Sequence, residues 1–354
     1  MKLVRTEDAV GHVLCHDMTQ IIVGGEDGQR FKGPRFRKGH VVQAEDIPVL
    51  LSMGKENLYV WELEPGMLHE DDAARRMAAL CLGDNTEVSG EPREGKIGIK
   101  ATRDGVFLLD SARLRAVNSV DQVMIATRRA NLTVLAGDDL AGTRVIPLVI
   151  EESRVAEAES AARVAECGPL MRVEPFKLKT AAIITTGSEV QKGRIKDRFT
   201  PMVEAKLAPF GITTTYHSTP GDVVEDIVAS IREALAAGVD LVCCTGGMSV
   251  DPDDNTPGAI KRAGARIVTY GAPVLPGAMM LLGYFQVDGR TVPVCGLPGC
   301  VMYSKATVFD LLLPRIVAGV ELTKADVVEL GEGGLALKGQ FDLMPRCPFT
   351  REAQ

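Results

Sequence analysis

The sequence predicts an α/β protein whose C-terminal half forms a mostly parallel sheet with flanking helices. From about residue 177, short β-branched runs alternate with helical segments, as in sheets whose parallel strands are joined by crossover helices. The runs that end at Thr185 and Thr245 both stop at a Thr-Gly turn that is followed by a carboxylate. Ligands of such sheets bind beyond the carboxyl ends of the strands, so both turns are expected to line one pocket.

Local signals place the elements of this half. Strands are expected at 180–185, 212–217, 239–245 and 266–270, and an Asp-Gly turn predicts a hairpin over 285–292. Thr200 and Thr256 each precede a proline, which favours the first helical position, so both are expected to start helices, with Thr200 as an N-cap. An apolar helix is expected over 302–313.

Smaller regions precede this α/β domain. Residues 1–65 predict a β-rich segment with a short helix beginning near Asp46 and a strand at 58–63. Residues 66–150 predict a small α+β domain with a helix over 70–83 and strands near 96–100, 106–109, 122–126 and 144–150. A connecting helix and linker are expected over 151–176, the α/β domain over 177–320, and a short tail over 321–354.

Composition narrows the class of protein. Hydrophobic residues make up 45% of 354 residues, which is enough for a sizeable core. The net charge of −7 argues against nucleic acid as a partner. No apolar run reaches the length of a membrane span and no signal peptide is evident, so a cytoplasmic protein is expected. Eight cysteines without a CxxC pair predict reduced, mostly buried thiols, with Cys243 and Cys244 on opposite faces of a strand.

Two turns carry the expected binding chemistry. Glycines at the ends of these strands let the backbone approach a ligand, and the neighbouring hydroxyls can contact an anion. GLPG at 296–299 follows a third strand and could form a further wall. The expected ligand-binding residues are Thr186, Gly187, Ser188, Gly246, Gly247, Met248, Ser249, Pro298 and Gly299.

Carboxylates near these turns predict a divalent cation. They would repel phosphate unless a cation lay between them, and Mg²⁺ binds one or two carboxylates together with waters and phosphate oxygens. The acidic set is Glu189, Asp197, Asp222, Asp251, Asp253 and Asp254. Asp222 has an equally plausible structural role, as a helix N-cap whose capping box is completed by Glu225. Asp254 has no such clear structural role.

Three other patterns carry no function. The P-loop-like run at 90–96 is followed by Ile97 where a P-loop has Ser or Thr. His12 and His16 have i, i+4 spacing but no obvious third metal ligand. No GxGxxG fingerprint opens the α/β region, which disfavours a nicotinamide enzyme.

Several ordered motifs resemble the molybdopterin-binding domain. They are TTGSEV, GRIKD, the Gly-Asp before the next helix, TGGMSVDPDD and GLPG, and they cover about residues 177–320. This domain occurs in the molybdopterin molybdenumtransferase (MoeA) family, in gephyrin and in small trimeric molybdopterin-binding proteins. The N-terminal region also looks like the non-catalytic segment of the MoeA family, so the whole chain is most similar to bacterial MoeA-like proteins.

The resemblance implies a late step of molybdenum cofactor synthesis. The implied substrates are adenylylated molybdopterin and molybdate, with Mg²⁺ assisting adenylate hydrolysis and metal insertion, and the implied assembly is a homodimer. Asp254, Asp222 and Glu189 match acidic residues of the family's active site and are the expected catalytic residues. Asp222, Asp254 and Asp253 are the expected metal ligands.

The chain departs from the family at three places. The usual PGKP motif is replaced by Leu275-Pro-Gly-Ala-Met279, so its lysine is missing, and Cys300-Val301 stands where GLPGNP ends in Asn-Pro. Only about 35 residues follow the α/β domain, too few for the family's C-terminal β-barrel.

These departures support molybdopterin binding better than catalysis. Two alternatives therefore stay open: a non-catalytic molybdopterin carrier or sensor, and a metal-dependent pyrophosphatase acting on ADP-ribose or a similar diphosphate. The second resembles the competence-damage-inducible family through TGG and PDDNT. The sequence does not say whether Cys300 or Cys347 touches the ligand.

Overall fold

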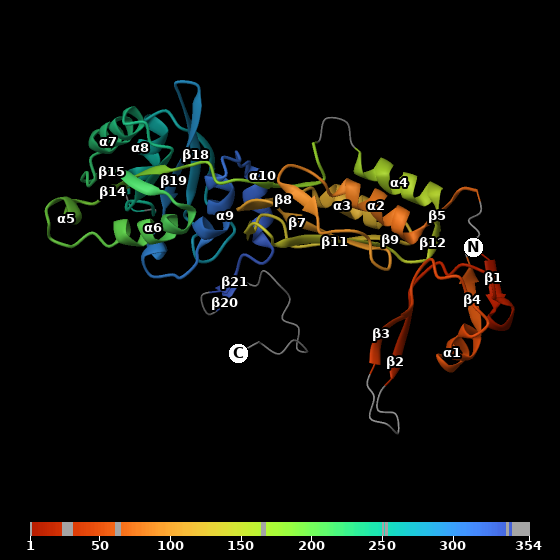
Figure 1. Cartoon of the computed structure of the whole chain (residues 1–354). Coiled ribbons are helices and arrows are strands. Elements are labelled where there is room, and N and C mark those ends of the chain that lie inside the picture. The colour runs from red at the N-terminus through yellow and green to blue at the C-terminus, as the bar shows by residue number, and fades with distance from the viewer. Residues whose placement is uncertain are drawn as a thin grey trace. The chain divides into compact units, whose positions relative to one another are not determined.

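The computed structural model describes residues 2–22, 31–60, 65–163, 168–249, 251, 254–337 and 340–341. The chain divides into two units, Met1–Glu174 and Pro175–Gln354, whose elements are labelled in Figure 1. Among the helices of these described ranges, none combines the length and the apolar character needed to cross a bilayer.

The first part of unit 1 contains two short antiparallel pairs. β1 (Lys2–Arg5) pairs with β4 (Asn57–Val60), and β2 (Met18–Ile22) pairs with β3 (Phe31–Phe36). η1 (Thr6–Asp8) and α1 (Asp46–Ser52) complete it. α1 begins where the sequence predicts a helix, whereas residues 61–63 of the predicted strand lie outside the described residues. Leu14, Leu50 and Leu58 belong to its apolar cluster.

The second part of unit 1 is a small α+β arrangement. Its main sheet has the order β6 (Thr86–Val88), β7 (Lys96–Ala101), β11 (Asp139–Val145) and β9 (Val123–Thr127). β10 (Thr133–Val134), β8 (Gly105–Leu109) and β13 (Met171–Glu174) form a second sheet, and β5 (Met67–His69) pairs with β12 (Val149–Glu151). α2 (Glu70–Leu80), α3 (Ser111–Asn118) and α4 (Glu152–Ala162) pack together over these strands (Figure 1).

One strand prediction in this part is wrong. The run 144–150 is not one strand, because β11 ends at Val145 and β12 begins at Val149. Pro147 lies between them, and proline has no backbone N–H to donate to a ladder. β12 then pairs with β5 in a separate sheet. The two strands share one apolar cluster through Val145 and Ile150.

Unit 2 is built on a six-stranded, mostly parallel sheet, as the sequence predicts. The order is β15 (Thr213–Ser218), β14 (Thr180–Thr185), β16 (Leu241–Thr245), β19 (Arg290–Leu297), β18 (Leu281–Val287) and β17 (Arg266–Tyr270). The first four strands are parallel. β18 is antiparallel to both of its neighbours, β19 and β17. The β18–β19 turn has positive φ at Asp288 (49°) and Gly289 (75°), which confirms the Asp-Gly hairpin.

Helices cover both faces of this sheet. They are α5 (Ser188–Gln191), α6 (Phe199–Leu207), η2 (Ala208–Phe210), α7 (Val224–Ala236), α8 (Thr256–Arg262), η3 (Gly299–Met302), α9 (Val308–Val317), α10 (Lys324–Val328) and η4 (Glu329–Gly331), and β20 (Ala336–Leu337) pairs with β21 (Gln340–Phe341). Cys243 packs with residues of α6 and α9, whereas Cys244 packs with residues of α7 and α8. The adjacent cysteines thus face opposite layers, as predicted.

The cysteine prediction agrees with the structure over the described residues. All six cysteines there are free, and only Cys300 is half-buried, the others being buried. Burial raises the pKa of Cys244 to about 12, so this thiol stays protonated and unreactive. Cys167 and Cys347 lie outside the described residues.

The helix predicted over 302–313 is shifted. A 3₁₀ turn, η3, occupies Gly299–Met302, and α9 begins only at Val308. Thr307 and Asp310 form a reciprocal capping box at the start of α9. This box satisfies backbone donors that the first turn of a helix leaves unpaired, so the helix begins there and not at the first apolar residue.

Candidate functional site

Three strand ends meet at one edge of the unit 2 sheet. The parallel register pairs Thr185 of β14 with Thr245 of β16, and Thr245 with Leu297 of β19. Adjacent strands in a sheet lie about 4.8 Å apart. The loops that follow these strands therefore begin side by side. They carry the two predicted turns and the Pro298-Gly299 pair.

The two Thr-Gly turns are joined by direct hydrogen bonds. The Thr186 N–H donates to the carbonyl oxygen of Thr245 over 2.8 Å, and the Thr186 and Thr256 hydroxyl oxygens are 3.1 Å apart. Gly246 has φ 83°, and a Cβ built there would lie 2.5 Å from the Thr186 carbonyl oxygen. Only glycine fits this conformation and this space without strain. The close approach of the Thr186 backbone therefore requires a glycine at position 246.

Asp222 does not cap α7. The N-cap position is Val223, which has no side-chain capping bond. The Asp222 Oδ2 instead accepts from the Ser188 backbone N–H (2.9 Å) and hydroxyl (2.6 Å). The Asn255 side-chain amide donates to the Asp222 carbonyl oxygen over 2.9 Å. The structural interpretation of Asp222 as a cap is therefore wrong. Its carboxylate instead joins the loops after β14 and β15, and its backbone carbonyl joins the loop after β16.

Asp254 lies beside the second turn. Its Oδ2 accepts from the Ser249 backbone N–H over 2.9 Å. The Tyr270 hydroxyl donates to the carbonyl oxygen of Met248 over 3.1 Å. Burial, and then the charge of Asp254, raise the pKa of Tyr270, so this hydroxyl stays a donor. Asp253 lies outside the described residues, so its role as a metal ligand stays a prediction.

Three other predicted site residues, Glu189, Gly299 and Met248, lie in different surroundings. Glu189 is exposed on the short helix α5, and Gly299 opens η3. The Met248 side chain is only 4% exposed and packs in the apolar cluster beside β19, where its Cε lies 2.6 Å from a Cβ built at Gly296. Its side chain therefore supports the turn, while its backbone is held by Tyr270.

A polar network around Asp197 connects the ends of β14 and β15 with the start of α6. Asp197 is evident from the sequence as one of the acidic set, but its partners are not. Asp197 accepts hydrogen bonds from the Phe199 and Thr200 backbone N–H groups over 2.8 and 3.1 Å, and so it caps α6 in place of the predicted Thr200. The Thr200 hydroxyl also donates to Asp197, and His217 Nε2 lies 3.3 Å from the same carboxylate. An Asp three residues before a Thr-Pro pair is the signal that could have identified this cap.

The Asp197 carboxylate is held ionised by its surroundings. Burial opposes its ionisation, but the hydrogen bonds from Thr200 and Phe199 outweigh that effect and hold the pKa of Asp197 below its ordinary value. Thr185, at the end of β14, donates to the same carboxylate over 3.2 Å. The network thereby fixes the strand end from which the first loop departs.

Asp222 and Asp254 each keep one carboxylate oxygen that no described residue engages. Within the described ranges no three His, Cys, Asp or Glu side chains cluster closely enough to hold a metal. Asp222 and Asp254 each use Oδ2 for loop N–H groups, and no described residue bonds the Oδ1 of either. A cation at either carboxylate would need further ligands from water or from a bound molecule.

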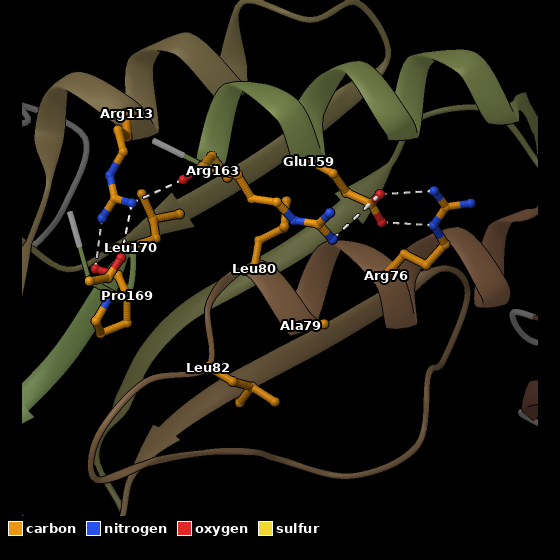
Figure 2. A pocket seen from close by; sticks show the side chains of 11 residues that line it. Arg76, Ala79, Leu80, Leu82, Arg113, Glu159, Arg163, Pro169 and Leu170 are labelled. Carbon is orange, nitrogen blue, oxygen red and sulfur yellow. Dashed lines mark hydrogen bonds and ion pairs between the residues drawn. The ribbon is translucent and has the colours of Figure 1, made fainter. Parts of the chain in front are cut away.

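A hollow in unit 1 is less suited to a ligand (Figure 2). It has a volume of about 370 Å³, and its arginines are engaged by the protein. Arg113 donates to the carbonyl oxygens of Ala162, Gly168 and Pro169. Arg76 makes two hydrogen bonds to Glu159, of 2.8 and 3.0 Å. Both side chains hold structural elements together.

Known proteins resemble separate parts of the chain. Residues 182–318 match the family described as "Probable molybdopterin binding domain", and residues 3–62 match a domain of unknown function. A CinA-like protein of Mycobacterium sp. (strain JLS) is 38% identical over 82 residues, which cover 23% of this chain and 20% of that protein. A CinA-like protein of Mycobacterium leprae is 35% identical over the same length. The matches span about a fifth of these relatives.

Solved structures of low identity resemble part of the chain as well. The tungsten cofactor synthesizing protein MoaB from Pyrococcus furiosus has 20% identity and a TM-score of 0.32, and the likeness covers 45% of this chain and 98% of that one. The protein CinA from Thermoplasma acidophilum, described as of unknown function, has 20% identity and a TM-score of 0.32, with 40% and 99% covered. Residues 182–318, which carry the site described above, are the part of the chain that matches the probable molybdopterin binding domain.

Proposed function

We propose that unit 2 binds molybdopterin in its adenylylated form and supports Mg²⁺-dependent insertion of molybdate with release of AMP. The observation that carries this proposal is the register of Thr185, Thr245 and Leu297, which brings three glycine-containing loops to one sheet edge. Membership of residues 182–318 in the molybdopterin-binding family supports the ligand class. The reaction and the metal rest on the carboxylates of the site.

The turns would hold the phosphate end of the ligand. Gly246 and Gly247 have positive φ and no side chains, so their backbone can come close to an anion. Ser188 and Ser249 lie beside the two carboxylates and add polar groups to the same edge. Their hydrogen bonds to the protein orient the loops before a ligand arrives, which lowers the entropic cost of binding.

The carboxylates would hold Mg²⁺ against that phosphate. Asp222 and Asp254 present the Oδ1 atoms that no described residue engages, while Oδ2 keeps each side chain oriented. Bound there, Mg²⁺ would neutralise phosphate charge and polarise the adenylate bond. Asp254 would orient the attacking water or molybdate, and Tyr270 and Ser249 would hold the Asp254 loop. Glu189 is proposed as a further acidic residue at the entrance.

The decisive experiment combines binding and turnover. The protein is titrated calorimetrically with molybdopterin and with adenylylated molybdopterin in Mg²⁺, and AMP is measured in the same samples after molybdate is added. We expect binding and molybdate-dependent AMP release. Asp254→Asn should reduce release at least tenfold with modest loss of binding, because a carboxylate that acts on the reacting atoms lowers turnover first.

A matched control uses another aspartate of the same unit. Asp226 is exposed on α7 and makes no side-chain hydrogen bond to a described residue. Asp226→Asn makes the same change of charge and should leave AMP release unchanged. Full turnover by Asp254→Asn would refute the role given to Asp254, and equal losses in both variants would point to a general charge effect.

Two alternatives are separated by the same samples. Binding without AMP release would identify a carrier or sensor, an outcome favoured by the missing lysine between Leu275 and Met279. The likeness of TGG and PDDNT to the competence-damage-inducible family favours a pyrophosphatase acting on ADP-ribose or a similar diphosphate as a second candidate. Metal-dependent hydrolysis of ADP-ribose together with no binding of molybdopterin would establish that function.

The site is also proposed to work in a homodimer. The resemblance to the MoeA family motivates this assembly, since that family builds its site between two subunits. Sedimentation velocity at micromolar concentration should show a species of twice the 37.9 kDa chain mass. A single monomeric boundary that persists while the protein still turns over substrate would contradict it.

A further inference from the structure

A second pocket lies within unit 1. It has a volume of about 1020 Å³, at the upper end of the range of pockets that hold small organic ligands. Its walls come from the segment around His16, the β3 end at Arg37 and Lys38, the start of α2, the β7 region and the end of β11. Its lining is mixed, with Tyr59, Ile146 and Leu148 among the charged groups.

Charged side chains of both signs line this pocket, and some are paired. Lys38 forms an ion pair with Asp71 and lies 3.2 Å from His69 Nδ1. Lys96 lies 3.8 Å from Glu94. These pairs are structural. Three arginines of the lining make no ion pair with any described residue: Arg37, Arg93 and Arg144.

One buried polar atom of this lining has no partner in the described part of the chain. The Arg144 Nε is buried and has no hydrogen-bond partner among the described residues. Glu70 is only 8% exposed, and the charge of Arg144 acts on its carboxylate. A buried charged or polar group that has no partner is unfavourable by several times the thermal energy. Such a group in a pocket calls for an explanation, and a bound ion or ligand that satisfies it is one.

The structure offers an internal comparison. In the hollow of Figure 2 three arginines line a cavity, and two of them, Arg113 and Arg76, are satisfied by carbonyl and carboxylate oxygens of the protein. In the second pocket the described residues supply no hydrogen-bond partner for the Arg144 Nε. The difference indicates that outside atoms complete this pocket.

We propose that this pocket of unit 1 binds a small phosphorylated molecule. The phosphate would lie against Arg93 and Arg144, because guanidinium groups bind phosphate oxygens in pairs. Glu70, deep in the pocket, would accept hydrogen bonds from N–H donors on the uncharged part of the ligand. Arg37 lines the same pocket and adds positive charge at its exposed side. This proposal does not depend on the function proposed for unit 2.

Two probes test the two ends of the site. Inorganic pyrophosphate carries only the charge, and GMP carries a phosphate and a base with paired N–H donors. Calorimetric titration of the full chain should detect both, with GMP the tighter. Arg144→Gln and Arg93→Gln should each raise the Kd for both probes about tenfold or more, the usual effect of losing a charged hydrogen bond. Glu70→Gln should weaken GMP selectively.

The controls separate this site from the one in unit 2. Arg103 is an exposed arginine of unit 1 that does not line the pocket, so Arg103→Gln should bind both probes like the wild type. Asp226→Asn, at an exposed residue of α7 outside the site proposed for unit 2, should do the same. Arg93 is exposed, so its variant is expected to fold even if changes at the half-buried Arg144 do not, and thermal melts check both.

The outcomes are distinct. Loss of both probes in Arg93→Gln or Arg144→Gln, with retention in Arg103→Gln, supports the pocket. No binding of either probe by the wild type, or equal binding by the Arg93 and Arg144 variants, overturns the proposal. Binding that is lost in an Asp222→Asn variant but kept in the Arg93 and Arg144 variants would assign the phosphate to unit 2. Failure of AMP release in the earlier experiment leaves these results unaffected.

Discussion

At the scale of single residues, the close approach of the two turns depends on Gly246. Its φ of 83° and the 2.5 Å between a built Cβ and the Thr186 carbonyl oxygen leave no room for a side chain. Gly246→Ala should lower the free energy of unfolding by about 1–3 kcal/mol and weaken ligand binding. Urea unfolding measures the first effect. Gly258→Ala, in α8 where nothing lies within 4 Å of the built Cβ, should be neutral or slightly stabilising.

A second prediction at this scale concerns pH. Because hydrogen bonds from Thr200 and Phe199 hold the pKa of Asp197 below its ordinary value, its ionised form stabilises the fold. That contribution is complete above the unfolded pKa of about 3.9, and it is lost as pH falls through the lower folded pKa. NMR titration of the Asp197 carboxyl should show this lowered pKa, and Thr200→Val should raise it. An unchanged pKa in that variant would refute the role of Thr200.

At the scale of elements, the start of α9 depends on its capping box. Thr307 is fully buried and exchanges hydrogen bonds with Asp310. Thr307→Val keeps the volume but removes the acceptor, so it should lower the free energy of unfolding by about 1 kcal/mol. Thr307→Ser keeps the cap and should cost less in the same thermal or urea melts. A Ser variant that is the less stable of the two would show that packing of the methyl group dominates.

At the scale of the whole molecule, each unit has its own core. The apolar clusters of unit 2 use residues from Phe176 onward, and those of unit 1 end at Val173. All six strands of the main sheet of unit 2 come from within it. A chain beginning at Pro175 should therefore fold alone, with a cooperative thermal transition seen by circular dichroism. An aggregated or non-cooperative product would show that unit 1 contributes to its stability.

The sequence by itself determined the class of fold and most of the sheet of unit 2. The strands at 180–185 and 266–270 match β14 and β17, because buried β-branched runs bounded by turns have few alternatives. The family resemblance of this half is confirmed for residues 182–318 at the level of the molybdopterin-binding domain. The sequence also placed Thr186, Gly246 and Asp254 near one sheet edge, since carboxyl ends of parallel strands meet there.

The tertiary structure alone decided which partners the polar groups have. The spacing of Asp222 to Glu225 predicts a helix cap, yet Asp222 accepts hydrogen bonds from Ser188, far along the chain. The capping of α6 by Asp197 and the unsatisfied Arg144 Nε likewise depend on contacts in space. Local patterns fix backbone propensities, whereas the partner of a side chain is set by segments that only folding brings together.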